Sequence, residues 1–207
     1  MQISELFRRQ DELQAEALFV REDLRLDEQM SAIGTVVSVG SAALGLMVWR
    51  DLDITVICGR LDVAEVAQAG ASLALHDRVN QVLFRNDTGT WNTDPGYPDG
   101  LYLGPRYQTA AGDSWKVDIW FVDEPDRQPD LTHVSSLPAR LSEVTRASIL
   151  RVKHDWAAKP EYGKSVTSYD IYRAVLDDGV RTPAGFEDWL TGHPRGYTPG
   201  PSAGSVR

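Results

Sequence analysis

Two short runs of β-branched residues constrain the fold most: GTVVSV at positions 34–39 and LDITVIC at positions 52–58. Each run is bounded by small or charged residues, which is typical of a buried strand. Asp53 lies inside the second run and Asp51 immediately before it. A carboxylate buried in a strand costs free energy unless it has a partner. The two aspartates therefore need an explanation beyond folding.

The rest of the chain alternates predicted helices with predicted strands. Further strands are expected at 80–84, 101–108 and 114–122, with a turn-rich loop at 86–100. Apolar spacing and capping residues predict helices at 4–32, 42–47, 62–75, 138–158, 168–176 and 183–190. We therefore expect an α/β (α+β) fold, with a mixed β-sheet flanked by helices and a small C-terminal helical unit.

The composition changes at the polar connector DEPDRQPD, positions 123–130. This change predicts a mixed α/β unit over residues 1–123 and a helical unit over residues 124–192. Residues 193–207 are rich in Gly, Pro and Ser, and we expect a disordered tail there. The N-terminus is charged throughout and no run reaches the about 20 apolar residues of a membrane span, so a cytoplasmic protein without a membrane partner is predicted.

The net charge and the cysteine content argue against several other classes of protein and of site. The formal net charge of −9 disfavours a partner of long nucleic acid, because such proteins usually present a basic face; a local basic pocket stays possible. The single cysteine, Cys58, excludes an intramolecular disulfide and a cysteine metal cluster.

The aspartates favour a metal site. Side chains two apart on a strand share a face, so Asp51 and Asp53 can meet one object. Asp118 lies inside another predicted strand, where Lys116 and Trp120 share its face. If these strands pair, three carboxylates converge, and their repulsion is relieved by divalent cations. Two Mg²⁺ ions about 4 Å apart can activate a hydroxyl and stabilise a leaving pyrophosphate.

Gly40 and Ser41 are predicted to bind phosphate. Glycine allows a close backbone approach and a positive φ. The helix expected after it offers N–H groups to an anion, with the Ser41 hydroxyl as a further donor.

The order of Gly40–Ser41, the pair Asp51 and Asp53, and the later strand residue Asp118 resembles the nucleotidyltransferase superfamily, which includes DNA polymerase beta. The resemblance covers roughly residues 30–123, and the layout is similar to small antibiotic and minimal nucleotidyltransferases. It implies that Asp51 and Asp53 bind both metals, and that Asp118 helps to bind one metal and to activate the acceptor hydroxyl. The reaction it implies moves a nucleoside monophosphate from an NTP, usually ATP, to an acceptor. Arg50 and the pair Ala42–Ala43 depart from many relatives.

Further candidates are less specific. Arg146 and Lys153, seven apart on one side of the predicted helix, are candidates for neutralising the triphosphate; two solvated charges are the alternative. Lys164 is a comparable cation candidate, and Glu143 is a candidate general base for the acceptor. Trp91 and Tyr97 are candidates for a wall against a nucleobase or acceptor; anchoring of the turn-rich loop is their alternative. The histidines at 76, 133 and 154 lack metal-ligand spacing and are expected at the surface.

The acceptor is not specified by any motif. Because the chain is short and acidic, a hydroxylated small molecule is the favoured acceptor. A protein hydroxyl, as in relatives that attach AMP to a partner, is the second candidate. A non-catalytic nucleotide-binding module that retains the fold is the third.

Overall fold

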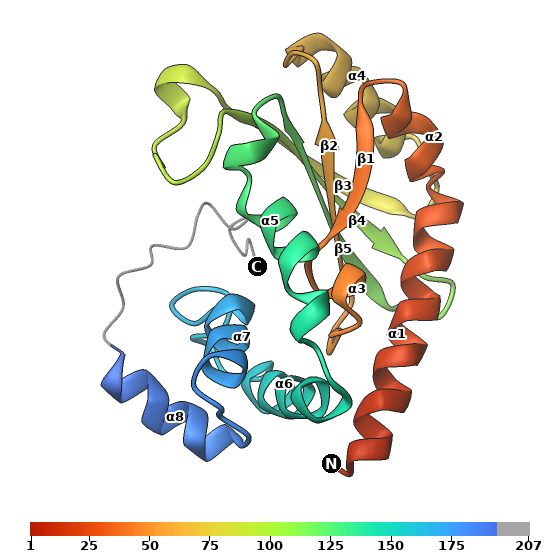
Figure 1. Cartoon of the computed structure of the whole chain (residues 1–207). Coiled ribbons are helices and arrows are strands. Elements are labelled where there is room, and N and C mark those ends of the chain that lie inside the picture. Colours follow the sequence, from red (N-terminus) through yellow and green to blue (C-terminus); the bar gives the residue numbers. More distant parts are fainter. Residues whose placement is uncertain (194–207) are drawn as a thin grey trace.

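A computed structural model describes residues 1–193 (Figure 1). The tail predicted at 193–207 lies, apart from its first residue, outside the described residues. One five-stranded sheet has the order β1-β2-β5-β4-β3, with β2 and β5 parallel and the other neighbours antiparallel. The predicted mixed sheet flanked by helices is confirmed. Its strands are β1 (Thr35–Val39), β2 (Asp51–Ile57), β3 (Val79–Asp87), β4 (Gly100–Gln108) and β5 (Ser114–Val122).

Each predicted helix has a counterpart with different boundaries, but the helix Pro129–Ser136 was not predicted. The predicted helix over 4–32 is divided, because Arg25 has a left-handed backbone with φ of 49°. The helix predicted from residue 138 begins instead after Ser142, whose side chain forms a capping box with Thr145. The helices are α1 (Ile3–Asp23), α2 (Leu26–Ser31), α3 (Gly40–Leu44), α4 (Val63–Ala74), α5 (Pro129–Ser136), α6 (Glu143–Trp156), α7 (Ser168–Leu176) and α8 (Pro183–Gly192). Single 3₁₀ turns lie at Gly89–Trp91, Pro125–Arg127 and Pro138–Arg140.

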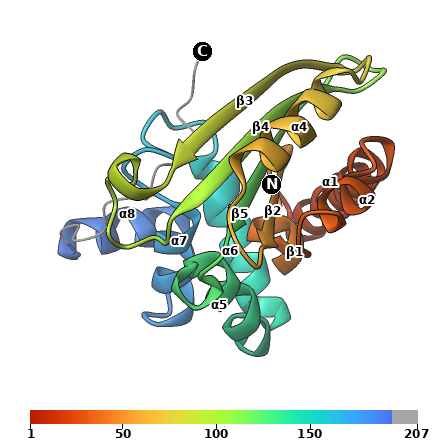
Figure 2. The ribbon, with the colours of Figure 1, turned by 90° about the horizontal axis from the view of Figure 1, so that it is seen from above.

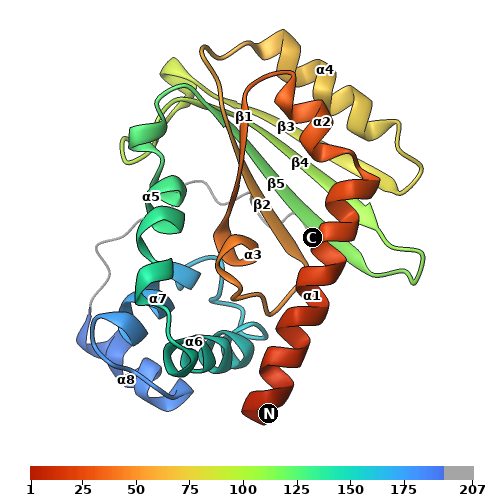
Figure 3. The same cartoon turned by 45° about the vertical axis from the view of Figure 1, so that its right-hand side comes forward.

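One face of the sheet is apolar. Leu52, Ile54 and Val56 alternate along β2 and pack in a core with residues of α1, α2 and α4. These three helices cover that face in Figure 3. The largest apolar core of the described residues therefore lies between the sheet and helices α1, α2 and α4.

A second core holds the C-terminal helices together. It joins α6, α7 and α8 to Leu6 of α1 and to Leu44 and Leu46, at the end of α3 and just beyond it. Helix α1 thus contributes to both cores, and its N-terminal end lies beside α6 in Figure 1. The helical unit expected over 124–192 completes its core with residues from before position 50.

The other face of the sheet borders a cleft of about 920 Å³. Figure 2 shows α7 and α8 on this side of the sheet, opposite α1, α2 and α4. From the sheet, the cleft is lined by residues of β2 and β5 and by residues of β4 and the segment before β4. From the helices, it is lined by residues of α7 and the segment before α7. No helix of residues 1–193 is long and apolar enough to cross a membrane.

Candidate active site

The parallel pairing of β2 and β5 brings the three aspartates together. Asp53 lies directly opposite Asp118, and Asp51 lies opposite Lys116. Each aspartate offers one oxygen, and these oxygens all lie within 4.8 Å of one another. The triad, Asp51, Asp53 and Asp118, lines the cleft. The strand register therefore creates the carboxylate cluster.

The triad is electrostatically unfavourable by itself. Burial, followed by the charges of Asp51 and Asp118, raises the pKa of Asp53 well above its usual range. Burial and the charge of Asp118 also raise the pKa of Asp51. The Asp51 Oδ1 atom is buried and has no hydrogen-bond partner among the described residues. A buried oxygen that accepts no hydrogen bond and lies beside two other carboxylates fits a divalent cation, and oxygen ligands of this kind suit Mg²⁺.

Asp118 is held by two neighbours on its own face of the sheet. The Tyr102 hydroxyl donates a hydrogen bond to Asp118 Oδ1 at 2.7 Å. Lys116 Nζ forms an ion pair with Asp118 Oδ2 and lies 3.7 Å from Asp51 Oδ1. Burial lowers the pKa of Lys116, but the charges of Asp51 and Asp118 outweigh it and the net shift is upward. Lys116 therefore supplies the nearest resident positive charge to the triad.

Two glycines leave room for this arrangement. At Gly40 φ is +64°, and an added Cβ would overlap the Asp53 carboxylate. At Gly104 an added Cβ would overlap the Tyr102 hydroxyl group. Any side chain at Gly40 would therefore displace Asp53, and any side chain at Gly104 would displace the tyrosine that holds Asp118.

Ser41 follows Gly40 at the start of α3 and lines the cleft beside the triad. Its exposed fraction is 9 %. The structure thus places both predicted phosphate-binding residues, Gly40 and Ser41, at the edge of the carboxylate cluster.

Arg146 and Lys153 are bound to backbone carbonyls just after α3, although the charges of Asp53 and Asp51 act on Lys153. Neither is among the described residues that line the cleft. Arg146 Nη2 donates to the Gly45 carbonyl at 3.1 Å, and Lys153 Nζ donates to the Leu46 carbonyl at 2.7 Å. Lys153 is 1 % exposed, and burial lowers its pKa to about 8. In this structure both cations hold the turn that follows α3.

Other cations line the cleft. Lys164, one of the weaker candidates, is among them, and so is Tyr97. Trp91 is 70 % exposed, and neither it nor Glu143 is a lining residue. Sequence reasoning gave no cleft role to the remaining lining cations, which are Arg50, Arg106, Lys116 and Lys159.

Two residues of α5 also reach the cleft. His133 was expected at the surface, but it stacks on Tyr169 with ring centroids 4.3 Å apart. Asp130 is, with Asp87, one of two carboxylates that line the cleft besides the triad, and burial raises the pKa of Asp130. No spacing rule pointed to either residue, because α5 is placed by tertiary packing. Tyr102 was missed too, although its alternation with Gly104 and Arg106 along β4 gave a signal.

Solved structures share this architecture, although no family model and no curated protein matches the chain. A Cid1 poly(U) polymerase mutant bound to MgATP is 18 % identical, covers 84 % of this chain and has a TM-score of 0.60. A cytoplasmic RNA terminal U-transferase is 19 % identical, covers 81 % of the chain and has a TM-score of 0.50. The fold is that of the nucleotidyltransferases. The predicted resemblance is thereby confirmed at the level of the fold.

The nucleotidyltransferase fold of this chain spans about half the length of these structures, 54 % of the first and 50 % of the second. A third, of Cid1 in complex with its short product ApU, is 18 % identical, with a TM-score of 0.51 over 83 % of this chain and 48 % of its own length.

The comparisons correct one prediction. The sequence favoured a small-molecule acceptor and excluded long nucleic acid, whereas the similar structures are described as RNA-modifying enzymes. The physical reason is that net charge is a sum over the whole chain. A total of −9 is compatible with the cations that line the cleft.

Proposed function

We propose that this protein is a Mg²⁺-dependent nucleotidyltransferase that adds a nucleoside monophosphate from an NTP to a terminal hydroxyl of RNA. The convergence of Asp51, Asp53 and Asp118 in one cleft carries the proposal. The RNA acceptor is supported by the solved structures with the same fold, which include an RNA terminal U-transferase.

The triad would hold magnesium, two ions in our proposal. Bound Mg²⁺ would neutralise developing negative charge on the phosphates and make the acceptor hydroxyl easier to deprotonate. Asp51 and Asp53 would hold the magnesium from β2, and Asp118 would hold it from β5. Lys116 has to shift from Asp118 or share it, because its ammonium group now occupies one side of that carboxylate.

Each part of the transfer is assigned to a group of the cleft. The acceptor oxygen forms a bond to the α-phosphorus as the bond from that phosphorus to the bridging oxygen breaks. Pyrophosphate leaves with the electron pair, and Asp118 takes the hydroxyl proton. Gly40 and Ser41 contact the triphosphate from the β1 side, where the glycine permits close approach. The volume of about 920 Å³ is at the upper end for ligand pockets, which span about 300–1,000 Å³, so it accommodates a nucleotide with the end of an acceptor.

We infer ATP as the first nucleotide to test. One similar structure holds MgATP, and another, of Cid1, holds a UTP analogue. ATP is therefore tested first, and GTP, CTP and UTP follow. Each is supplied with Mg²⁺ and a short oligouridylate or oligoadenylate labelled at its 5′ end.

The experiment follows RNA extension on a gel and pyrophosphate release in solution. Extension by the native chain that is lost in Asp53→Asn and kept in Arg60→Gln would support the proposal; Arg60 is an exposed cation that does not line the cleft. Tight Mg²⁺-dependent NTP binding without any transfer would identify a nucleotide-binding module instead. Pyrophosphate release that RNA does not stimulate would contradict the acceptor.

A further inference from the structure

A second hollow of about 470 Å³ adjoins the cleft. Four of its seven lining residues are cationic and none is acidic. We call it the basic hollow; its lining is Arg9, Val48, Trp49, Arg50, Arg106, Ser114 and Lys116. Trp49, Arg50, Arg106 and Lys116 also line the cleft, so the two spaces share a wall. In a chain of net charge −9, this is a local concentration of positive charge beside the triad.

Strand pairing gives the basic hollow an unusual centre. Arg106 of β4 lies directly opposite Lys116 of β5. Like charges in such a cross-strand pair destabilise a sheet. Lys116 is compensated by the triad, but the Arg106 guanidinium makes no ion pair and no hydrogen bond with the described residues. The stability of the fold does not explain why two cations, Arg106 and Lys116, lie directly opposite each other. Binding of an anion would explain it.

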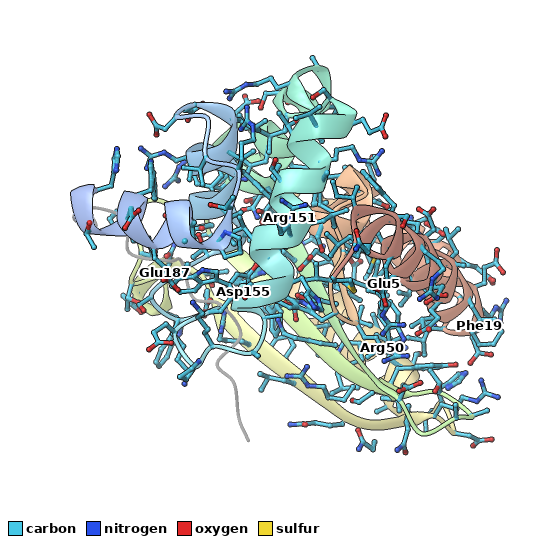
Figure 4. All side chains as sticks on the ribbon, turned by 90° about the horizontal axis from the view of Figure 1, so that it is seen from below. Glu5, Phe19, Arg50, Arg151, Asp155 and Glu187 are labelled. Atoms are coloured by element: carbon cyan, nitrogen blue, oxygen red, sulfur yellow. The ribbon has the colours of Figure 1, made fainter. Side chains whose placement is uncertain are left out.

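The other two cations are partly neutralised. Arg50 lies 2.7 Å from Glu16 and 2.9 Å from Asp113, and Figure 4 shows it where α1 meets the strands. Arg9 of α1 lies 3.7 Å from Glu12. Arg106 is therefore the cation of the basic hollow with the most charge left for a ligand.

The sheet order places the basic hollow on the side of the triad away from the predicted triphosphate site. From β1 to β4 the order is Gly40 after β1, the aspartates on β2 and β5, and then Arg106 on β4. In-line displacement needs the attacking and leaving oxygens on opposite sides of the phosphorus. If the leaving pyrophosphate lies toward Gly40, the acceptor approaches from the side of β4.

We propose that the basic hollow binds the phosphodiester that precedes the terminal nucleotide of the acceptor, with Arg106 as its main contact. This inference rests on the proposed function and names the acceptor-binding surface of the same site. It assigns the triphosphate and the acceptor backbone to separate cations.

The first test is direct binding of a fluorescent oligouridylate, without NTP or metal, over a range of salt concentrations. Arg106→Gln should weaken binding several-fold, and the slope of log affinity against log salt should fall by about 0.7, the value for one phosphate contact on a single strand. Arg106→Lys should restore the slope. The matched control Arg60→Gln, which removes an exposed charge from outside both spaces, should behave as the native chain.

The second test separates the acceptor from the nucleotide. In the extension assay Arg106→Gln should raise the KM for RNA and leave the KM for NTP unchanged. A nucleoside acceptor, which has no phosphodiester, should be used equally well by the variant and the native chain. If Arg106→Gln does not fold, Arg9→Gln serves as the second variant, since Arg9 is a partly exposed residue of α1.

The outcomes distinguish the two proposals. Equal affinities and salt slopes for native chain and Arg106→Gln would overturn the basic hollow as an acceptor site, even if the native chain extends RNA. Weaker binding by Arg106→Gln in a chain that never extends RNA would support an RNA-binding hollow and refute the proposed transfer.

Discussion

The two faces of the sheet are built from alternate residues of the same strands but are stabilised in opposite ways. On β2, Leu52, Ile54 and Val56 face the helices behind the sheet and form its core. Asp51 and Asp53 face the cleft, where burial raises the pKa of both carboxyls. The apolar face lowers the free energy of the fold by burial. The acidic face raises the free energy of the fold, and the proposed cation would offset this cost. The stabilising residues and the proposed functional residues therefore lie on separate faces of one strand.

The largest expected effect comes from Asp53→Asn. We expect transfer to fall by about 1,000-fold, equivalent to about 4 kcal/mol, because the cleft loses a metal ligand. Stability without metal should rise, since one buried negative charge is removed. Initial rates with Mg²⁺ check the loss of transfer, and thermal unfolding in EDTA checks the gain in stability. A variant that is inactive and also less stable would show that Asp53 has a structural role.

Ile54→Ala tests the opposite face, one residue away. We expect a loss of about 2–5 kcal/mol in the free energy of unfolding, because Ile54 is fully buried in the core. The rate per folded molecule should stay close to native. Urea unfolding measures the loss, and Ile54→Val, with an expected loss of about 0.5–1.5 kcal/mol, is the graded control. A selective loss of activity would mean that the two faces are coupled.

Magnesium should offset the destabilising effect of the acidic face on the fold. At a concentration of about 100 times its Kd, a cation that binds only the folded chain stabilises it by about 2.7 kcal/mol. We expect such a rise in the native chain and in Ile54→Ala, measured as a shift of the unfolding midpoint with added MgCl₂. In Asp53→Asn the shift should be small. An equal shift in all three would place the cation outside the triad.

The acidic face should also make stability depend on pH. Because the pKa values of Asp51 and Asp53 are raised in the folded state, these groups destabilise the fold progressively as pH rises above their ordinary value of 3.8. The penalty is complete once pH exceeds the raised pKa values. The stability advantage of Asp53→Asn should therefore widen from acidic to neutral pH in EDTA and narrow when Mg²⁺ is added. A pH-independent difference would contradict this linkage.

The smallest effect is expected from Tyr102→Phe. It removes the hydrogen bond to Asp118, worth about 1 kcal/mol, and leaves the ring in place. We expect transfer to slow by less than about tenfold, in line with that energy, and the KM for NTP to stay the same. Gly104→Ala, which would push the same hydroxyl away, should slow transfer in the same way. A loss as large as that of Asp53→Asn would make Tyr102 part of the chemistry.

Strand residues were predicted better than helix residues. The period of two on a strand fixes the face of Asp51, Asp53 and Asp118, and the structure places their oxygens within 4.8 Å of one another. Arg146 and Lys153 shared one side of a predicted helix, but helical spacing does not say which neighbour that side meets. It meets the turn after α3. Net charge does not say where the individual charges lie, and for this reason the prediction of the acceptor was wrong.

The sequence by itself determined the strands, their alternation and the positions of Gly40, Ser41 and the aspartates, because these depend on local geometry. The tertiary structure decided what those residues face. The parallel register of β2 and β5 joins the triad, the β4 register sets Arg106 opposite Lys116, and helix packing brings Asp130 and His133 to the cleft. Contacts between residues distant in the chain depend on the packing of whole elements, and no local spacing specifies that packing.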